Sequence, residues 1–171
     1  RKAKPMIIAA NKIDVPGAEK NYERLKQLFP QYTIIPCSAE AELAFREAAK
    51  QGLIDYIPGE PTFNIQQPEK LSEKQTKALQ FLKINILDKH QATGVQQVLN
   101  HVVFNTLNYI AIHPGGVNKL EDKNGNCIPD CFLMPAGTTA LGFAFRLHTD
   151  FGNKFICAKD LASWRARSLR K

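Results

Sequence analysis

The hydrophobic and polar positions of the first forty residues predict a strand, a helix and a second strand. Met6–Ala10 is an unbroken apolar run that ends in the polar residues Asn11–Asp14. Such a run is typical of a buried strand in a parallel sheet, with functional residues at its C-terminal end. Residues 18–29 have apolar side chains at the spacing of an amphipathic helix, and residues 32–36 form a second apolar run before Cys37–Ala39. This βαβ order places both polar loops at one sheet edge.

Three helices are predicted in the middle of the chain. Residues 40–51 are rich in Ala and Glu and precede Gly52, a common residue at helix C-termini. A helix over 72–90 opens with the capping box of Ser72. Thr93 is expected to cap a third helix, whose apolar face continues to residue 107.

The pattern changes near residue 108, where strands return. Residues 109–112 and 127–134 predict two strands, and Thr138–Thr139 supplies the cap of a helix that runs to residue 148. Residues 154–158 predict a third strand. Two strands, a helix and a further strand indicate a small β-grasp module.

Composition fits an ordinary globular protein of one or two domains. The chain has 171 residues, 44% of them hydrophobic and 23% charged. No apolar run reaches the length of a membrane span and no signal peptide is visible, so we expect a cytoplasmic protein without a membrane partner. The 23 basic and 16 acidic residues give a net charge of +7, which favours polyanionic partners.

The cysteines and histidines predict neither a metal site nor a catalytic group. Cys127 and Cys131 are interpreted as small hydrophobic residues of a strand, because a zinc site would also need His113, His148 or Cys157. Four scattered cysteines are too few for a disulfide scaffold, which favours a reducing compartment.

The candidate chemistry lies in the two loops at the strand ends. Asn11, Lys12 and Asp14 spell Asn-Lys-x-Asp, and Ser38 and Ala39 follow the next strand. This pair resembles the two guanine-recognition motifs of GTPases. A carboxylate only accepts hydrogen bonds, so Asp14 can bind the N1–H and amino donors of guanine, which adenine lacks at these positions. The alternative for the first loop alone is an ordinary polar turn.

The resemblance also implies the roles of the other four residues. The alkyl stem of Lys12 would lie on the base, and Asn11 would tie the loop to a phosphate-binding loop. The Ala39 N–H would meet guanine O6, and the Ser38 hydroxyl would brace the Asp14 carboxylate.

A second resemblance covers the end of the chain. Residues 134–139 (Met-Pro-Ala-Gly-Thr-Thr) and 145–150 (Phe-Arg-Leu-His-Thr-Asp) look like a TGS domain. Together with the Asn-Lys-x-Asp loop, this resembles the Obg-like, YchF-type GTPases of the archaeal and eukaryotic branch that keeps Asp in the base motif. The expected α/β fold has residues 1–107 as the C-terminal half of a P-loop GTPase domain with accessory helices. Residues 108–171 form a truncated TGS (β-grasp) domain.

The family resemblance implies GTP or GDP as ligand, with Mg²⁺ in the intact protein, and a role in translation. The ribosome or RNA would bind through the TGS domain and a basic tail that contains Arg165, Arg167, Arg170 and Lys171. The chain starts without Met and has no Gly-Lys pair for a phosphate-binding loop, so we expect a fragment that is inactive alone. The alternative is a non-enzymatic TGS module that binds RNA or protein.

Overall fold

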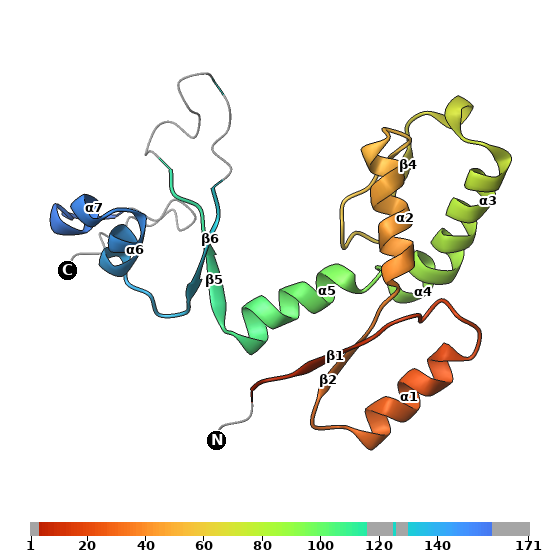
Figure 1. Cartoon of the computed structure of the whole chain (residues 1–171), viewed down its shortest axis with the longest axis horizontal. Helices are drawn as coiled ribbons and strands as arrows, with labels where there is room; N and C mark the ends of the chain where they lie inside the picture. Colours follow the sequence, from red (N-terminus) through yellow and green to blue (C-terminus); the bar gives the residue numbers. More distant parts are fainter. Residues whose placement is uncertain (1–3, 116–124, 126–129, 159–171) are drawn as a thin grey trace. The chain divides into compact units, whose positions relative to one another are not determined.

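The computed structural model of the chain describes residues 4–115, 125 and 130–158 (Figure 1). It divides into two compact units, Arg1–Val102 and Val103–Lys171. The division falls inside the helical segment that the sequence assigns wholly to the first domain.

The first unit begins with the predicted βαβ arrangement. Strand β1 (Ile7–Ala10) and strand β2 (Thr33–Pro36) are parallel, with Ile8 opposite Ile34, and helix α1 (Ala18–Leu28) connects them. The strand–helix–strand prediction is confirmed. Parallel neighbours end at the same sheet edge, so the loops after β1 and β2 are adjacent.

Strand β1 is less buried than the sequence predicts. Ala9 is exposed, while Ile7, Ile8 and Ala10 are only half-buried. Among the described residues β1 pairs with β2 alone, so one of its edges has no neighbouring strand. The prediction of a buried strand is therefore wrong for this structure.

Short strands and helices follow β2. Helix α2 (Ala39–Lys50) has Gln51 at its C-cap and is followed by Gly52, whose φ of +71° fits the glycine predicted to terminate the helix. Ser72 and Gln75 form the predicted capping box. The remaining elements of this unit are β3 (Ile54–Asp55), β4 (Asn64–Ile65), the short 3₁₀ helix η1 (Pro68–Lys70), α3 (Glu73–Leu82), the π-helical turn η2 (Lys83–Leu87), α4 (Asp88–His90) and α5 (Val95–Asn100).

The core of this unit joins α2 to the helices that follow it. The Phe45 ring of α2 is fully buried and lies 5.0 Å from the ring of Tyr56 and 5.2 Å from that of Phe63, between centroids. Ile86 and Leu87 of η2 belong to the same buried cluster. Each fully buried side chain of this size contributes roughly 1.5–3 kcal/mol. This cluster fixes α2, and with it the loop from which α2 begins.

The predicted cap of α5 is wrong. The residue before α5 is Gly94, with φ of +83° and no side-chain cap. The Thr93 hydroxyl instead donates to Glu42, which lies 51 residues away in sequence. Thr93 lies one residue before the N-cap position, which Gly94 occupies, and its side chain is held by Glu42 instead of by the first turn of α5.

The second unit contains a hairpin and two helices. The π-helical segment η3 (His101–Thr106) crosses from the first unit and leads to β5 (Tyr109–Ile112), which pairs antiparallel with β6 (Phe132–Pro135). Thr139 caps α6 (Ala140–Leu147), as predicted, and α7 (Thr149–Asn153) follows. The rings of Phe132 and Phe143 meet edge to face at 5.6 Å, which packs α6 on the hairpin. Residues 127–129 of the predicted second strand lie outside the described residues.

The predicted third strand does not form. Residues 154–157 have no strand structure, Ala158 makes a single bridge, and Ile156 is 85% exposed. The Lys154 N–H donates to the Asp150 carbonyl at 3.0 Å, because the backbone is still completing the last turn of α7. That donor is therefore unavailable to a strand ladder. The β-grasp arrangement is not shown.

Candidate functional site

The two candidate loops are joined by backbone hydrogen bonds that continue the β1–β2 ladder. The Cys37 N–H donates to the Ala10 carbonyl at 3.0 Å, and the Ile13 N–H donates to the Cys37 carbonyl at 3.1 Å. These bonds bring Asn11, Lys12 and Asp14 beside Ser38 and Ala39. The structure thus places all five candidate residues at one sheet edge.

Asn11 binds the second loop directly. Its Oδ1 accepts the Ala39 N–H at 3.0 Å, and the Cys37 thiol lies 3.9 Å from the same oxygen. The resemblance implies that the Ala39 N–H meets guanine O6, so a bound base would have to share or displace the Asn11 oxygen.

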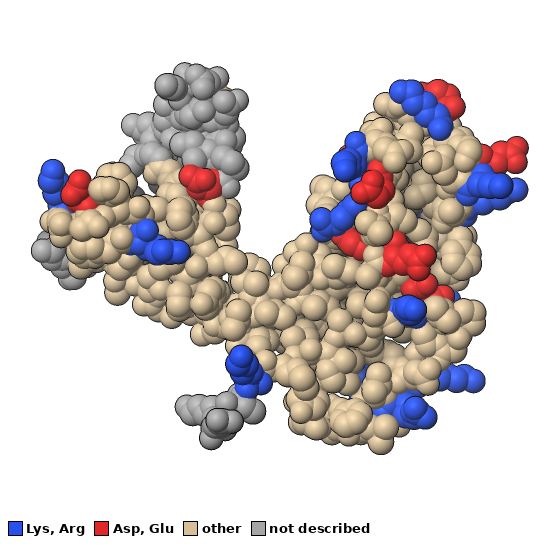
Figure 2. Space-filling model, in the orientation of Figure 1, with Lys and Arg blue, Asp and Glu red and all other residues tan. Residues whose placement is uncertain are grey.

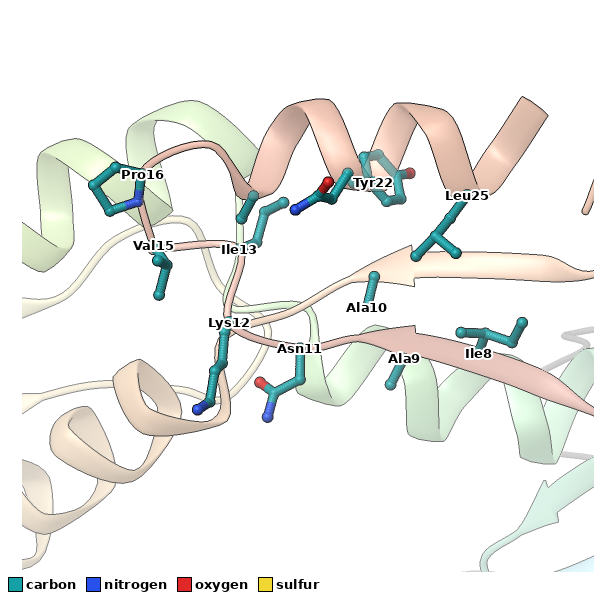
Figure 3. Close-up of a pocket in the computed structure, with 12 residues that line it drawn as sticks. Ile8, Ala9, Ala10, Asn11, Lys12, Ile13, Val15, Pro16, Tyr22 and Leu25 are labelled. Carbon is teal, nitrogen blue, oxygen red and sulfur yellow. The ribbon is translucent and has the colours of Figure 1, made fainter. Parts of the chain in front are cut away.

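The Asn-Lys-x-Asp loop has a specific backbone conformation. Lys12 has φ of +66°, a left-handed conformation that costs a residue with a side chain roughly 1–3 kcal/mol. The loop holds it because Ile13 is buried in the core and bonded to Cys37. Lys12 stays exposed and Asp14 is half-buried. In Figure 3 the Asn11 and Lys12 side chains extend to the side of the loop opposite Ile13. This arrangement leaves polar groups available to a ligand.

Ser38 makes a different bond from the one implied by the resemblance. It is the N-cap of α2, and its Oγ accepts the Ala41 N–H at 3.3 Å. Among the described residues it makes no hydrogen bond to Asp14. A hydroxyl can accept one bond and still donate its proton, so the bracing role stays a prediction.

A groove of about 450 Å³ runs between β1 and α1 (Figure 3). Its wall is mainly apolar, and Asp14, Ser38 and Ala39 do not line it. The groove is therefore not the candidate base site, although it shares the Asn-Lys-x-Asp backbone. Its lining includes Ile8, Ala10, Ile13, Tyr22 and Leu25.

A buried carboxylate lies one helical turn beyond Ser38. Glu42 is 4% exposed, and its Oε2 accepts hydrogen bonds from the Tyr56 hydroxyl at 2.8 Å and the Thr93 hydroxyl at 2.5 Å. Its Oε1 accepts the Arg46 Nε–H at 2.6 Å. The sequence does not reveal this group, because a Glu in an Ala- and Glu-rich helix is usually exposed. Only its spacing from Ser38 could have suggested a role.

These contacts set the pKa of both acids. Burial raises the pKa of the Glu42 carboxyl, but hydrogen bonds from Thr93, Arg46 and Tyr56, with the Arg46 charge, outweigh burial and leave the pKa below its usual range. Burial, followed by the bond to Glu42 and its charge, raises the pKa of Tyr56 to about 12. Glu42 is therefore ionised and Tyr56 neutral at pH 7.

The described part of the chain contains no cluster of three or more His, Cys, Asp or Glu side chains able to hold a metal ion. Cys131 and Cys157 are exposed free thiols. Within the same residues, no helix has the length and hydrophobicity needed to cross a bilayer.

Comparison with known proteins places this site in a family. Residues 9–116 match the family described as Obg-like GTPase YGR210-like, G4 motif-containing domain. An uncharacterized GTP-binding protein of Methanocaldococcus jannaschii is 46% identical over 92% of this chain and 40% of its own length. An uncharacterized GTP-binding protein of Schizosaccharomyces pombe is 31% identical over 80% of this chain and 35% of its own length.

A solved structure agrees with these matches. The crystal structure of a GTP binding protein from Pyrococcus horikoshii has a TM-score of 0.67 and 36% identity, covering 96% of this chain and 42% of the other. The chain thus spans about two fifths of the length of the relatives that it matches. Because the family match covers more than half of the chain and includes the Asn-Lys-x-Asp loop, the chain belongs to the YGR210-like group of Obg-like GTPases.

Proposed function

We propose that the loops after β1 and β2 bind the guanine base of GTP or GDP. Asp14 accepts the guanine N1–H and amino protons, the Lys12 stem covers the base, and Ala39 donates to O6. Ser38 caps the helix that carries Ala39, and the Asn11 oxygen, which accepts the Ala39 N–H in this structure, shares that donor with O6 or gives it up. One observation carries the proposal: the β1–β2 ladder continues into both loops and brings them together.

The start of α2 suits an acceptor such as guanine O6. Ala39 is the first residue of α2, so its N–H is one of the donors that the helix leaves without an internal partner. The helix dipole adds partial positive charge there. Asn11 Oδ1 accepts this N–H at 3.0 Å, which supports the proposal that an oxygen acceptor can reach the position.

GTP hydrolysis needs residues other than those of the proposed base site. We propose that the longer protein hydrolyses GTP, with Mg²⁺ neutralising phosphate charge when bound. This chain contains no Gly-Lys pair, and the five loop residues select the base without contributing a catalytic group.

The test compares guanine and adenine nucleotides in a protein that joins these residues to a phosphate-binding loop. GDP should bind on the order of a hundredfold more tightly than ADP, because adenine leaves the Asp14 carboxylate unpaired. Asp14→Ala should remove the preference, whereas Asp55→Ala, which changes an exposed carboxylate on β3, should keep it. Equal GDP and ADP affinities in the unsubstituted protein would refute the proposal.

A second function concerns the second unit. We propose that it acts as a TGS-type module that binds RNA, on the ribosome or elsewhere. The packed hairpin and α6 support the module, and the net charge of the whole chain, +7, favours a polyanion. Figure 2 shows Lys and Arg interspersed with Asp and Glu over the visible face of the first unit, so this face offers no broad basic patch. The basic tail (165–171) lies outside the described residues.

A further inference from the structure

The segment between α4 and α5 packs on the loop that follows β2. The Ser38 N–H donates to the Thr93 carbonyl at 2.8 Å. A Cβ on Gly94 would collide with the Pro36 carbonyl oxygen and would lie 2.8 Å from the Cys37 Cβ. Gly94 also has φ of +83°, so both the space and the backbone require glycine. The Thr93–Gly94 segment is therefore closely fitted to the Ser38–Ala39 loop.

Glu42 anchors this segment to α2. The Thr93 side chain is buried, and its hydroxyl donates to Glu42 Oε2 at 2.5 Å. Tyr56 donates to the same oxygen at 2.8 Å. Helix α2 begins at Ala39, directly after the loop that follows β2. Glu42 therefore connects this helix to the Thr93–Gly94 segment, which packs on the same loop.

Two backbone hydrogen bonds fix the direction of the Ala39 N–H, and the Glu42–Thr93 side-chain bond holds the two segments that make them. The Ser38 carbonyl accepts the Glu42 N–H at 3.1 Å, while the Ser38 N–H is bonded to Thr93. In a planar trans peptide the N–H points opposite to the preceding carbonyl, so fixing the Ser38 carbonyl fixes the Ala39 N–H. That N–H points at Asn11 Oδ1 in this structure, and guanine O6 would share this donor with the Asn11 oxygen or displace it.

We infer that Glu42, Thr93 and Gly94 are positioning residues for guanine recognition, acting on the base through Ser38 and Ala39. The inference rests on the proposed guanine site and adds to it three residues outside both motifs. A well-directed Ala39 N–H favours an oxygen at position 6 of the purine and disfavours the amino group of adenine. The three residues therefore add to the guanine preference that Asp14 sets.

The test measures the ratio of the dissociation constants for ADP and GDP in the protein with a phosphate-binding loop. Thr93→Val removes the hydroxyl without changing the side-chain shape, and Gly94→Ala introduces the collision with Pro36. Each should lower the ratio roughly tenfold, mainly by weakening GDP binding. A tenfold change corresponds to the free energy of about one hydrogen bond. Thr93→Ser keeps the hydroxyl and should restore most of the ratio.

Matched controls separate positioning from general destabilisation. Thr76→Val removes a hydroxyl bonded to the Ser72 carbonyl at 3.1 Å, away from the loop. Gly52→Ala changes a glycine with φ of +71° whose added Cβ would meet nothing closer than 3.7 Å. Both should keep the ratio. Thermal unfolding of every variant sets a measuring temperature at which all are folded, and if Gly94→Ala does not fold, the Thr93 pair decides.

The outcomes distinguish the two proposals. No GDP preference in the unsubstituted protein overturns the guanine site itself. A GDP preference that stays unchanged in Thr93→Val overturns the positioning role alone, as does a Thr93→Ser variant that behaves like Thr93→Val. A lowered ratio in Thr93→Val, restored in Thr93→Ser and unchanged in Thr76→Val, supports the positioning role.

Discussion

Replacing Tyr56 by Phe tests the carboxylate network in its simplest form. Tyr56 is 8% exposed, and its hydroxyl donates to the ionised, buried Glu42 at 2.8 Å. The substitution removes this one oxygen and keeps the aromatic ring that packs on Phe45 at 5.0 Å. No large cavity is created, so the change in stability reports mainly the lost hydrogen bond.

The expected cost is about 2 kcal/mol at pH 7. A hydrogen bond to a charged group contributes about 1.5–3 kcal/mol, and its loss leaves the buried carboxylate with one donor fewer. The Thr93 and Arg46 donors remain, which keeps the cost below that of an unpaired buried charge. The decrease in the free energy of unfolding should be smaller at low pH, because Glu42 becomes protonated there.

Urea unfolding followed by circular dichroism measures this cost. The midpoint should fall with little change in the denaturant dependence, because the surface exposed on unfolding is the same. Tyr32→Phe is the matched control, since the Tyr32 hydroxyl makes no hydrogen bond among the described residues and its loss should cost less than about 0.5 kcal/mol. If Tyr56→Phe costs no more than Tyr32→Phe, the Glu42 network does not stabilise the fold as argued.

Three further predictions concern pH, activity and RNA. The folded pKa of Glu42 lies below its unfolded value, so its contribution to stability is complete above the unfolded pKa and is lost as pH falls through the folded pKa. Urea midpoints from pH 7 to pH 3 should fall more steeply for the unsubstituted chain than for Glu42→Gln, and parallel curves would contradict this. The 171-residue chain alone should hydrolyse no GTP above background in a phosphate-release assay, and measurable turnover by the pure chain would overturn that expectation. If the second unit and basic tail bind single-stranded RNA, log affinity should fall with log salt at a slope of roughly −2 to −3 between about 50 and 200 mM. Substituting Ala for Arg165, Arg167 and Arg170 should flatten that slope. RNA binding that does not depend on salt, or no RNA binding at all, would exclude RNA as a partner.

Local patterns were enough to predict the elements that carry the site. The apolar runs before Asn11 and Cys37 gave a correct parallel pair, because their length and the intervening helix allow few other arrangements. The Ser72 capping box and the Thr139 cap were also correct, since a cap depends on residues within one helical turn. Because each motif follows one strand of this parallel pair, the five candidate residues lie at the same edge of the sheet.

The errors arose where distant contacts decide the structure. Thr93 matched a helix cap, but its hydroxyl binds Glu42, and nothing near either residue in sequence reveals that pair. Residues 154–158 have strand-forming side chains, yet the backbone there still completes α7. The motif resemblance predicts a ligand as the partner of the Ala39 N–H. In this structure Asn11 accepts that N–H, and this bond depends on the geometry of two loops.

Exchanging the base preference through Asp14 is the sharpest test of guanine recognition by the Asn-Lys-x-Asp loop. Xanthine carries a carbonyl where guanine has its amino group, and an Asn amide can donate to that carbonyl. In the protein with a phosphate-binding loop, Asp14→Asn should weaken GDP and strengthen xanthosine diphosphate, reversing the order found in the unsubstituted protein. Competition binding with GDP and xanthosine diphosphate measures both affinities together. An Asp14→Asn protein that still prefers GDP to the same degree would contradict recognition of the base by Asp14.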